Sequence, residues 1–374
     1  MTESLEAGKT GLIPDVPART QLLKTLRSNR VKSLAIGIAG TAKNTGKTTT
    51  MSIIMNEIKK NPEILLGLTS IGYDGEKFDN VTGLPKPRIE VWPGNIVAIA
   101  ESCMKVCSAE LEEIQRTDIA TPLGKVIISR VAKAGKVLLA GPNNSRDLRI
   151  VLELLRGLAN LTIVDGALNR IAPMVEVDGL ILVTGAARFT EIPRLAEDTR
   201  CIVDILSTPV LAEQGKTEAL GSILGQSGFD ELLQKCAAAD SINIQGVAGL
   251  QYLKELAALR GGELKGKRFI FNDPIKLLLA GEALQVHKVL YELSNNSGAG
   301  IGVAKACKLL AMTVNPYYPK YRYNRADYEE AYVDSAGLLA CISASAGIPC
   351  YDVFRQGGKE LYKIIIDYWN TMGL

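Results

Sequence analysis

The stretch GTAKNTGKTTT, residues 40–50, constrains the fold of this chain more than any other. It follows the apolar run VKSLAIGIAG (31–40), which predicts a buried strand. It leads into TTTMSIIMNEIKK (48–60), whose spacing and basic end predict a helix. Between a strand and a helix, a glycine-rich turn can aim successive backbone N–H groups at an anion. The sequence therefore predicts a phosphate-binding loop.

The glycine spacing differs by one position from the common pattern G-x-x-x-x-G-K-[ST]. Counted back from Gly46, that pattern puts its first glycine at Thr41, but the glycine is at Gly40. Gly40-Thr41 followed by Gly46-Lys47-Thr48 resembles the G-T-x-x-x-x-G-K-T loop of dethiobiotin synthetases and the longer loop of deviant-Walker ATPases. The extra lysine of the deviant-Walker loop would fall at Ala42, whereas this chain has Lys43. The spacing therefore fits a longer loop, with a homodimer left open.

We expect the whole loop to hold a nucleotide. Lys47 is expected to contact the β- and γ-phosphates and to take part in catalysis, and the hydroxyl of Thr48 is expected to bind Mg²⁺. The predicted nucleotide-binding residues are Gly40, Thr41, Ala42, Lys43, Asn44, Thr45, Gly46, Lys47, Thr48 and Thr49. The alternative is a glycine turn that caps an ordinary helix.

Two aspartates are candidates to complete the site. Asp165 ends the apolar run in LTIVDG, where a carboxylate can reach a magnesium ion, and Asp74 follows a second apolar run in TSIGYDGE. We expect both to act in catalysis and at the metal. The alternatives are a turn cap for Asp165 and a solvated loop for Asp74 and Glu76.

Residues that would recognise the base are less evident. Asn272 and Asp273 in FNDP, and Asn315 in VNPYYP, follow predicted strands and offer polar groups to adenine. Asx-turn hydrogen bonds beside a proline are the interpretation that we favour for both segments.

Short apolar strands alternate with helical stretches through most of the chain. This pattern predicts an α/β fold with a doubly wound, mostly parallel sheet and a C-terminal α/β portion. We place a phosphate-loop domain at 1–240 and a C-terminal domain or lobe at 241–374. The segment 135–144 is predicted to be a strand, and the tyrosine-rich segment 316–332 is predicted to be a loop that is either an interface or an exposed connector.

Composition argues against several classes of function. A net charge of +3 and 5% aromatic residues do not favour nucleic-acid binding. No apolar run approaches the ~20 residues that span a bilayer, and no export signal is evident at the N-terminus, so we expect a cytoplasmic protein away from membranes. Seven scattered cysteines and one histidine, His287, do not favour a metal centre, a disulfide framework or a His-dependent nucleophile.

Longer phrases carry a more specific resemblance. GLTSIGYDGEKFDNVTGLPKPRIEV (67–91) and TIVDGALNRIAPMVEVDGLILVTGAA (162–187) resemble the reactivase subunit associated with lysine 5,6-aminomutase. The resemblance runs through most of the chain after about residue 10. It implies a P-loop NTPase that uses ATP and Mg²⁺ to open the aminomutase, so that intact adenosylcobalamin replaces a damaged cofactor. It also implies a second, mismatch-repair-like ATPase subunit as a partner.

Two other functions are compatible with the loop. One is an ATP-dependent carboxylate-activating ligase of the dethiobiotin synthetase or Mur ligase type, with the substrate held by the 73–88 segment. The other is a nucleotide-dependent switch without turnover. The sequence carries no D-x-H-x-x-G motif of base-off cobalamin binding.

Overall fold

A nine-stranded sheet forms the body of the protein. The computed structural model describes residues 33–72, 88–167, 171–259, 262, 264–325 and 327–372. Seven neighbouring strands of the large sheet are parallel, and the last two join the sheet by antiparallel pairing. In spatial order they are β17 (Cys350–Tyr351), β14 (Leu309–Asn315), β9 (Gly179–Gly185), β1 (Leu34–Gly40), β8 (Leu161–Ala167), β2 (Leu66–Ser70), β4 (Ile96–Ala100), β6 (Gly124–Lys133) and β5 (Glu110–Thr121). The predicted α/β fold with a mostly parallel sheet is confirmed.

Strand β1 shows why the sheet is covered on both faces. Every residue of β1 is buried, and successive side chains point to opposite faces. Ile36 and Ile38 belong to one apolar cluster, whereas Ala35 and Ala39 belong to another. An isolated strand with two apolar faces would be insoluble, so layers of helices on both sides are required.

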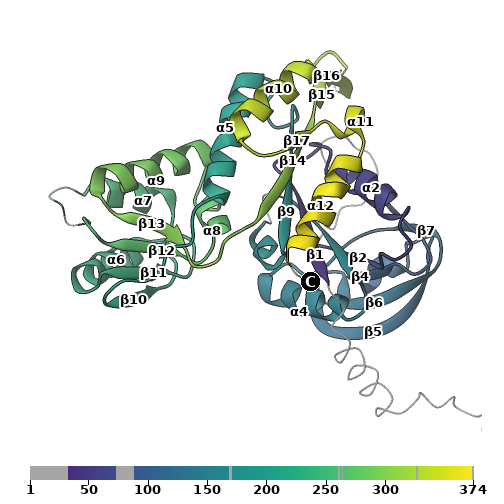
Figure 1. The fold of residues 1–374 in the computed structure, drawn as a ribbon, viewed down its shortest axis with the longest axis horizontal. Coiled ribbons are helices and arrows are strands. Elements are labelled where there is room, and N and C mark those ends of the chain that lie inside the picture. Colours follow the sequence, from purple (N-terminus) through teal and green to yellow (C-terminus); the bar gives the residue numbers. More distant parts are fainter. Residues whose placement is uncertain are drawn as a thin grey trace, which may run out of the picture.

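Helices supply both layers. One face packs against α2 (Lys47–Ile58), α11 (Val353–Gln356) and α12 (Lys359–Thr371), and the other packs against α4 (Ser145–Arg156), the 3-10 helix η2 (Ala172–Glu176) and α5 (Ile192–Leu206). Figure 1 shows α2 and α12 side by side in front of the large sheet. Helix α10 (Ser335–Ala346) packs beside α5, and the short α3 (Glu101–Met104) follows β4. In the described part of the chain, no helix is both long and apolar enough to span a membrane.

The antiparallel edge of the large sheet departs from the sequence prediction. Strand β6 turns back at Gly124, whose φ is +96°, and pairs with the exposed, charged edge strand β5. The segment predicted as a strand at 135–144 contributes only β7 (Gly135–Val137), which pairs with β3 (Ile89–Val91) in a separate two-stranded sheet. The sequence ELEEIQRTDIAT does not show the apolar pattern of a strand, because an edge strand carries charged residues that prevent it from pairing with other chains.

A second, smaller lobe inserts between β9 and β14. Its four parallel strands run in chain order: β10 (Thr217–Leu220), β11 (Ser241–Ile244), β12 (Arg268–Phe271) and β13 (Gly300–Val303). The connections contain α6 (Gln226–Ala238), α7 (Leu250–Ala257), α8 (Pro274–Leu278) and α9 (Ala283–Ser297). Apolar residues of α6, α7 and α9 share one cluster with Phe269 and Phe271. We call this unit, residues 217–303, the small lobe.

The division of the chain at residue 240 does not coincide with the division between the sheets. It falls between β10 and β11 of the same small sheet, and β14 and β17 return to the large sheet after the small lobe. The strands of both sheets are short, and nothing in such a short segment indicates which sheet it will join. The N-terminal and C-terminal parts of the chain therefore build one body together (Figure 1).

The tyrosine-rich segment is a β-hairpin instead of a loop. Strands β15 (Tyr317–Arg322) and β16 (Asp327–Tyr332) pair in an antiparallel register. Tyr321 contacts the rings of Tyr323 and Tyr328 with centroids about 5 Å apart. Cross-strand aromatic pairs of this kind stabilise a two-stranded sheet.

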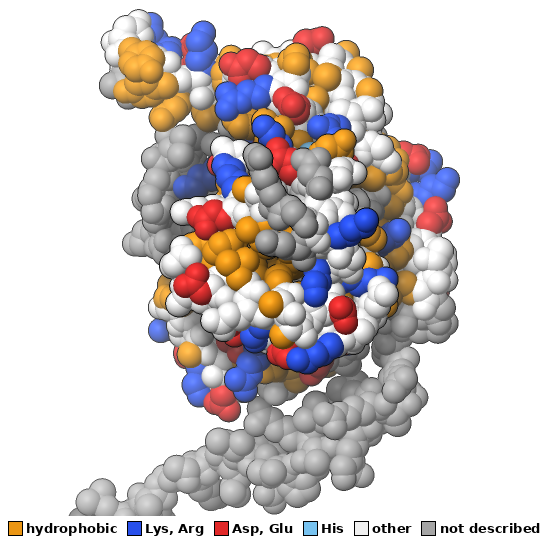
Figure 2. All heavy atoms as spheres, turned by 90° about the vertical axis from the view of Figure 1, so that its left-hand side faces the viewer, with side chains coloured by type: hydrophobic (Ala, Val, Ile, Leu, Met, Phe, Trp, Pro, Cys, Tyr) orange, Lys and Arg blue, Asp and Glu red, His pale blue; other side chains and the backbone are white. Residues whose placement is uncertain are grey.

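Figure 2 shows the molecule from the small-lobe side, with acidic and basic side chains interspersed around an apolar patch.

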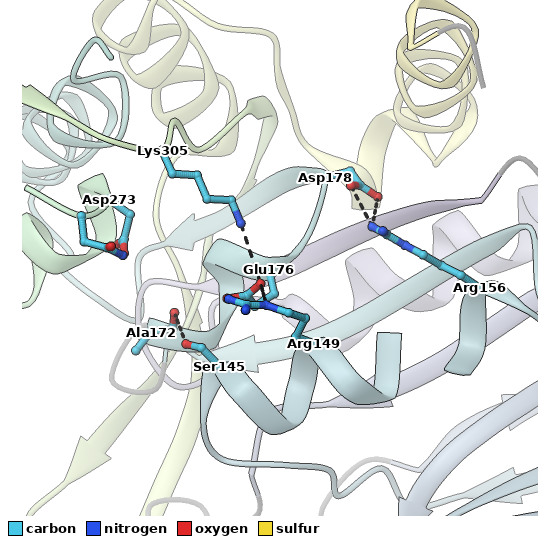
Figure 3. A network of polar contacts seen from close by, with 9 residues as sticks. Ser145, Arg149, Arg156, Ala172, Glu176, Asp178, Asp273 and Lys305 are labelled. Atoms are coloured by element: carbon cyan, nitrogen blue, oxygen red, sulfur yellow. Dashed lines mark hydrogen bonds and ion pairs between the residues drawn. The ribbon is translucent and has the colours of Figure 1, made fainter. Parts of the chain in front are cut away.

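An ion-pair network lies where the large sheet meets the segment that returns from the small lobe. Arg149 of α4 donates two hydrogen bonds of 2.9 Å to Glu176, and Lys305 approaches the same carboxylate at 3.8 Å (Figure 3). Beside it, Arg156 pairs with Asp178, which also accepts a hydrogen bond from the backbone of β1. These residues line a cavity of about 530 Å³.

The Glu176 carboxylate is 7% exposed, and its environment holds it ionised. Burial by itself raises its pKa, but the Arg149 hydrogen bonds and the Lys305 charge outweigh burial, and the pKa lies below 4.5. The pair therefore stabilises the folded protein above pH 4.5, and this contribution declines as the pH falls through the lowered pKa.

We expect Glu176→Gln to lower the free energy of unfolding at neutral pH by about 1–2 kcal/mol, because the exposed Arg149 keeps part of its hydration. The deficit should shrink when urea unfolding is repeated below pH 4.5. Glu153→Gln, at an exposed acid lining the same cavity, is the control and should change stability little. A deficit that is the same at both pH values would contradict the electrostatic explanation.

Candidate functional site

The predicted phosphate loop lies between the end of β1 at Gly40 and the start of α2 at Lys47. Two of its residues have left-handed backbone: Asn44 with φ +62° and Gly46 with φ +93°. The glycine spacing has a steric reason. A Cβ on Gly40 would lie 3.0 Å from Oγ1 of Thr45, because the loop folds back over the end of the strand. A side chain at position 40 would therefore crowd the Thr45 hydroxyl where the longer loop closes.

Three carbonyl groups of the loop are held by side chains, two of them from outside the loop and one from within it. Arg188 donates to the oxygen of Thr41 at 2.8 Å, and Thr45 Oγ1 donates to the oxygen of Ala42 at 3.0 Å. Asn315 Nδ2 donates to the oxygen of Asn44 at 3.3 Å. In a trans peptide the N–H group points opposite to the C=O group. The N–H groups that share these peptide planes therefore point away from the supports, as an anion cradle requires.

The first turn of α2 adds to this electropositive site. Gly46 at the N-cap supplies no side-chain cap, and the first turn contains no acidic residue. The first N–H groups of a helix have no partner within the helix, and the helix dipole makes this end positive. Thr48, in the first turn, is half-buried next to Lys47. Loop and helix together are suited to an anion with several oxygens.

Lys47 and Asp165 meet at the mouth of the loop. Their side chains are 24% and 25% exposed, and Nζ lies 2.8 Å from Oδ1. The two groups form an ion pair, but the angles at the contact do not meet the criteria of a hydrogen bond. Asp165 is placed by β8, where it pairs in register with Ile38 of β1 and Ser70 of β2. Neighbouring parallel strands thus bring the predicted cation and the predicted carboxylate together.

The floor of the loop is fastened to the strands on its other side. The backbone N–H of Thr41 donates to Val183 of β9 at 2.8 Å, and its hydroxyl bonds to that of Thr184 at 3.0 Å. In α2, the buried hydroxyl of Thr50 contacts that of Thr313 in β14 at 2.9 Å. These bonds fix the loop relative to the sheet, so little ordering remains to be done when a ligand binds.

The other predicted loop residues differ in position. Lys43 is exposed, Thr49 is half-buried, and Thr45 is buried. Asp74 and Glu76 lie outside the described residues. Gly72, the last described residue before them, accepts the Ser70 hydroxyl at 3.3 Å next to the strand end that pairs with Asp165.

The base-recognition candidates are engaged in local hydrogen bonds. Asp273 caps α8 by accepting from the backbone of Lys276 at 3.0 Å, and Asn272 donates to Asp273. These two residues belong to the small lobe. Asn315 accepts from the backbone of Tyr317 at 3.0 Å, the Asx-turn geometry that the sequence favours. Its amide nitrogen supports the phosphate loop, which the sequence did not predict.

Sequence reasoning also missed Arg188. It lies in the turn after β9, and Nε and Nη2 bond to both oxygens of Asp198 in α5 at 2.6 and 2.9 Å. The available signal was its position, three residues after β9, which pairs with the strand β1 that precedes the loop. The partner Asp198 was not identifiable, because pairing across ten residues depends on how α5 packs.

Cysteine chemistry does not contribute to this site. All seven thiols are free, and burial raises the pKa of Cys103, Cys236, Cys307 and Cys350 to about 11. Within the described residues, no group of three or more His, Cys, Asp or Glu side chains is arranged to hold a metal ion. A magnesium ion bound to nucleotide needs fewer protein ligands, since phosphates and water complete its coordination.

Comparison with known proteins adds little. No protein-family model matches the chain, and no curated protein matches it. The crystal structure of LAO/AO transport system kinase is similar at 13% identity with a TM-score of 0.22. The likeness covers 75% of this chain and 66% of that protein's chain. A TM-score this low supports no inference about function. Any such inference therefore rests on the geometry of the site.

Proposed function

We propose that the protein binds Mg·ATP at the loop formed by residues 40–49 and acts as a P-loop NTPase. The observation that carries this proposal is the 2.8 Å approach of Lys47 to Asp165 at the mouth of the loop. A turn that only capped a helix would not need a lysine held by a carboxylate from the adjacent strand. The pinned peptide planes of the loop support the same function.

The ion pair suggests how the parts would be used. Phosphate oxygens would attract the Lys47 ammonium group away from Asp165, and the Asp165 carboxylate would then face Mg²⁺ directly or through water. The Thr48 hydroxyl is the second proposed magnesium ligand. Asp74 stays a candidate for the γ-phosphate. Magnesium supplies charge neutralisation at the phosphates, and the chain's own contribution is positioning.

We further propose that nucleotide binding is coupled to a protein partner. The phrases at 67–91 and 162–187 resemble the reactivase of lysine 5,6-aminomutase, and they contain Asp74 and Asp165. In this proposal ATP favours the state that binds the open aminomutase, assisted by a mismatch-repair-like subunit, and adenosylcobalamin is exchanged there. A nucleotide can shift such an equilibrium only by its difference in affinity for the two states.

Lys47→Ala should weaken Mg·ATP binding by about 100-fold, because one charge-assisted contact to phosphate is worth roughly 3 kcal/mol. Isothermal titration calorimetry measures the affinity. Lys43→Ala is the matched control, since Lys43 is an exposed lysine of the same loop, and it should change affinity by less than about threefold. Equal losses for the two variants would indicate general electrostatic attraction instead of a defined site.

Asp165→Asn should weaken binding of ATP with magnesium by about tenfold or more, because it removes a carboxylate from the cation. Without magnesium, the variant should bind ATP as well as or better than the wild type, since Lys47 is no longer held by the carboxylate. Titrations with Mg²⁺ and with EDTA make the comparison. Equal loss under both conditions would place Asp165 in a structural role.

The protein should restore activity to lysine 5,6-aminomutase that has been inactivated by turnover. The assay contains ATP, Mg²⁺, fresh adenosylcobalamin and the second subunit, and Lys47→Ala is the control. Recovery that requires an intact Lys47 would support the proposal. No recovery with the wild type, together with ATP hydrolysis stimulated by a small carboxylate, would favour the ligase. Tight binding without hydrolysis would favour the switch.

A further inference from the structure

We propose that Arg188 and Asp198 are a positioning pair that couples the phosphate loop to the small lobe through helix α5. This inference rests on the proposed nucleotide site and concerns its regulation. Arg188 uses Nη1 on the loop carbonyl of Thr41, and it uses Nε and Nη2 on Asp198. One guanidinium group therefore connects the loop to a residue of α5 in a fixed planar geometry.

The pair acts as a unit because it is buried. The side chains of Arg188 and Asp198 are 15% and 9% exposed. Asp198 lies on the packed side of α5, between Leu195 and Ile202, which are both fully buried. Either charge without the other would be a buried ion without a partner, which costs several kcal/mol. If the Thr41 carbonyl shifts, Asp198 and helix α5 must therefore shift with it, or the contacts of Arg188 must break.

The turn that carries Arg188 is itself braced. The backbone N–H of Arg188 donates to Gly185 at the end of β9. The guanidinium groups of Arg188 and Arg194 lie 5.4 and 4.0 Å from the centre of the Phe189 ring, and Arg194 belongs to the first turn of α5. Such cation–π contacts tie the turn to the start of the helix.

Helix α5 continues from this turn to the small lobe. Its 15 residues span roughly 22 Å. Asp204, near its end, lies 3.1 Å from Nε2 of His287 in α9. Ile202 and Ile205 belong to the same apolar cluster as Val286 and Val289 of α9. Figure 1 shows α5 between the two lobes. A packed helix moves as a body, so its two ends are mechanically linked.

The loop end responds to phosphate through one peptide plane. The oxygen held by Arg188 belongs to Thr41, and the N–H of the same peptide belongs to Ala42. A phosphate that accepts from this N–H polarises the peptide and strengthens the bond at its oxygen. Bound nucleotide thus favours the state in which Arg188 is engaged. By linkage, the position of the small lobe in turn affects nucleotide affinity.

The test is hydrogen–deuterium exchange of the full chain with and without saturating Mg·ATP. In the wild type, nucleotide should slow exchange in the loop and, by about fivefold or more, in α9. Arg188→Lys retains the charge but cannot make the three-way contact. At saturating nucleotide it should keep the slowing in the loop, while the effect in α9 falls below about twofold.

Two further variants separate coupling from folding. Arg188→Met with Asp198→Leu replaces the buried pair by apolar side chains, so it should fold and also lose the α9 response. Arg322→Lys breaks a comparable bidentate pair with Asp327 in the hairpin and should leave the response unchanged. A wild type that binds nucleotide without slowing α9, or a full α9 response in both Arg188 variants, would overturn the coupling. A wild type that does not bind nucleotide would overturn the proposed function itself.

Discussion

Strand β1 is paired on both sides by parallel strands, and the arrangement of the candidate site follows from that pairing. Because β8 and β9 run in the same direction as β1, their carboxyl ends meet at the same edge of the sheet. β1 delivers the loop, β8 delivers Asp165, and β9 leads to the turn that carries Arg188. Three segments that are far apart in the sequence thus contribute to one site without a long irregular connection.

The parts of this arrangement that were predictable are those encoded locally. Apolar runs such as AIGIA and LTIVD identify β1 and β8, because a strand that is buried on both faces must be apolar throughout. The spacing of Gly40, Gly46 and Lys47 predicts the loop, and a carboxylate at the end of a buried run predicts Asp165. Parallel order at a common edge then explains why Lys47 and Asp165 lie close together, although their ion pair itself was not predicted.

What the sequence did not predict depends on tertiary pairing. Arg188 and Asn315 support loop carbonyls from segments about 150 and 270 residues away, so no local pattern marks them. The β5–β6 hairpin was missed because a charged edge strand lacks the apolar run of a buried one. The domain boundary near residue 240 stays a prediction, and the sequence marks it weakly for a related reason. The strands on either side of it are short, and three-dimensional packing decides which neighbours they pair with.

The insertion of a whole lobe between β9 and β14 limits how nucleotide binding can be used. The small lobe connects to the large sheet through α5 on one side and through the segment around Lys305 on the other. The first connection begins at the turn that touches the phosphate loop, whereas the second enters at the opposite, amino-terminal end of β14. In the proposed coupling, a change at the phosphates reaches the small lobe by the first route, because this route starts at a residue that contacts the phosphate loop. In the proposed function, this asymmetry would let nucleotide binding act on the small lobe through one connection while the other stays attached to the large sheet through β14.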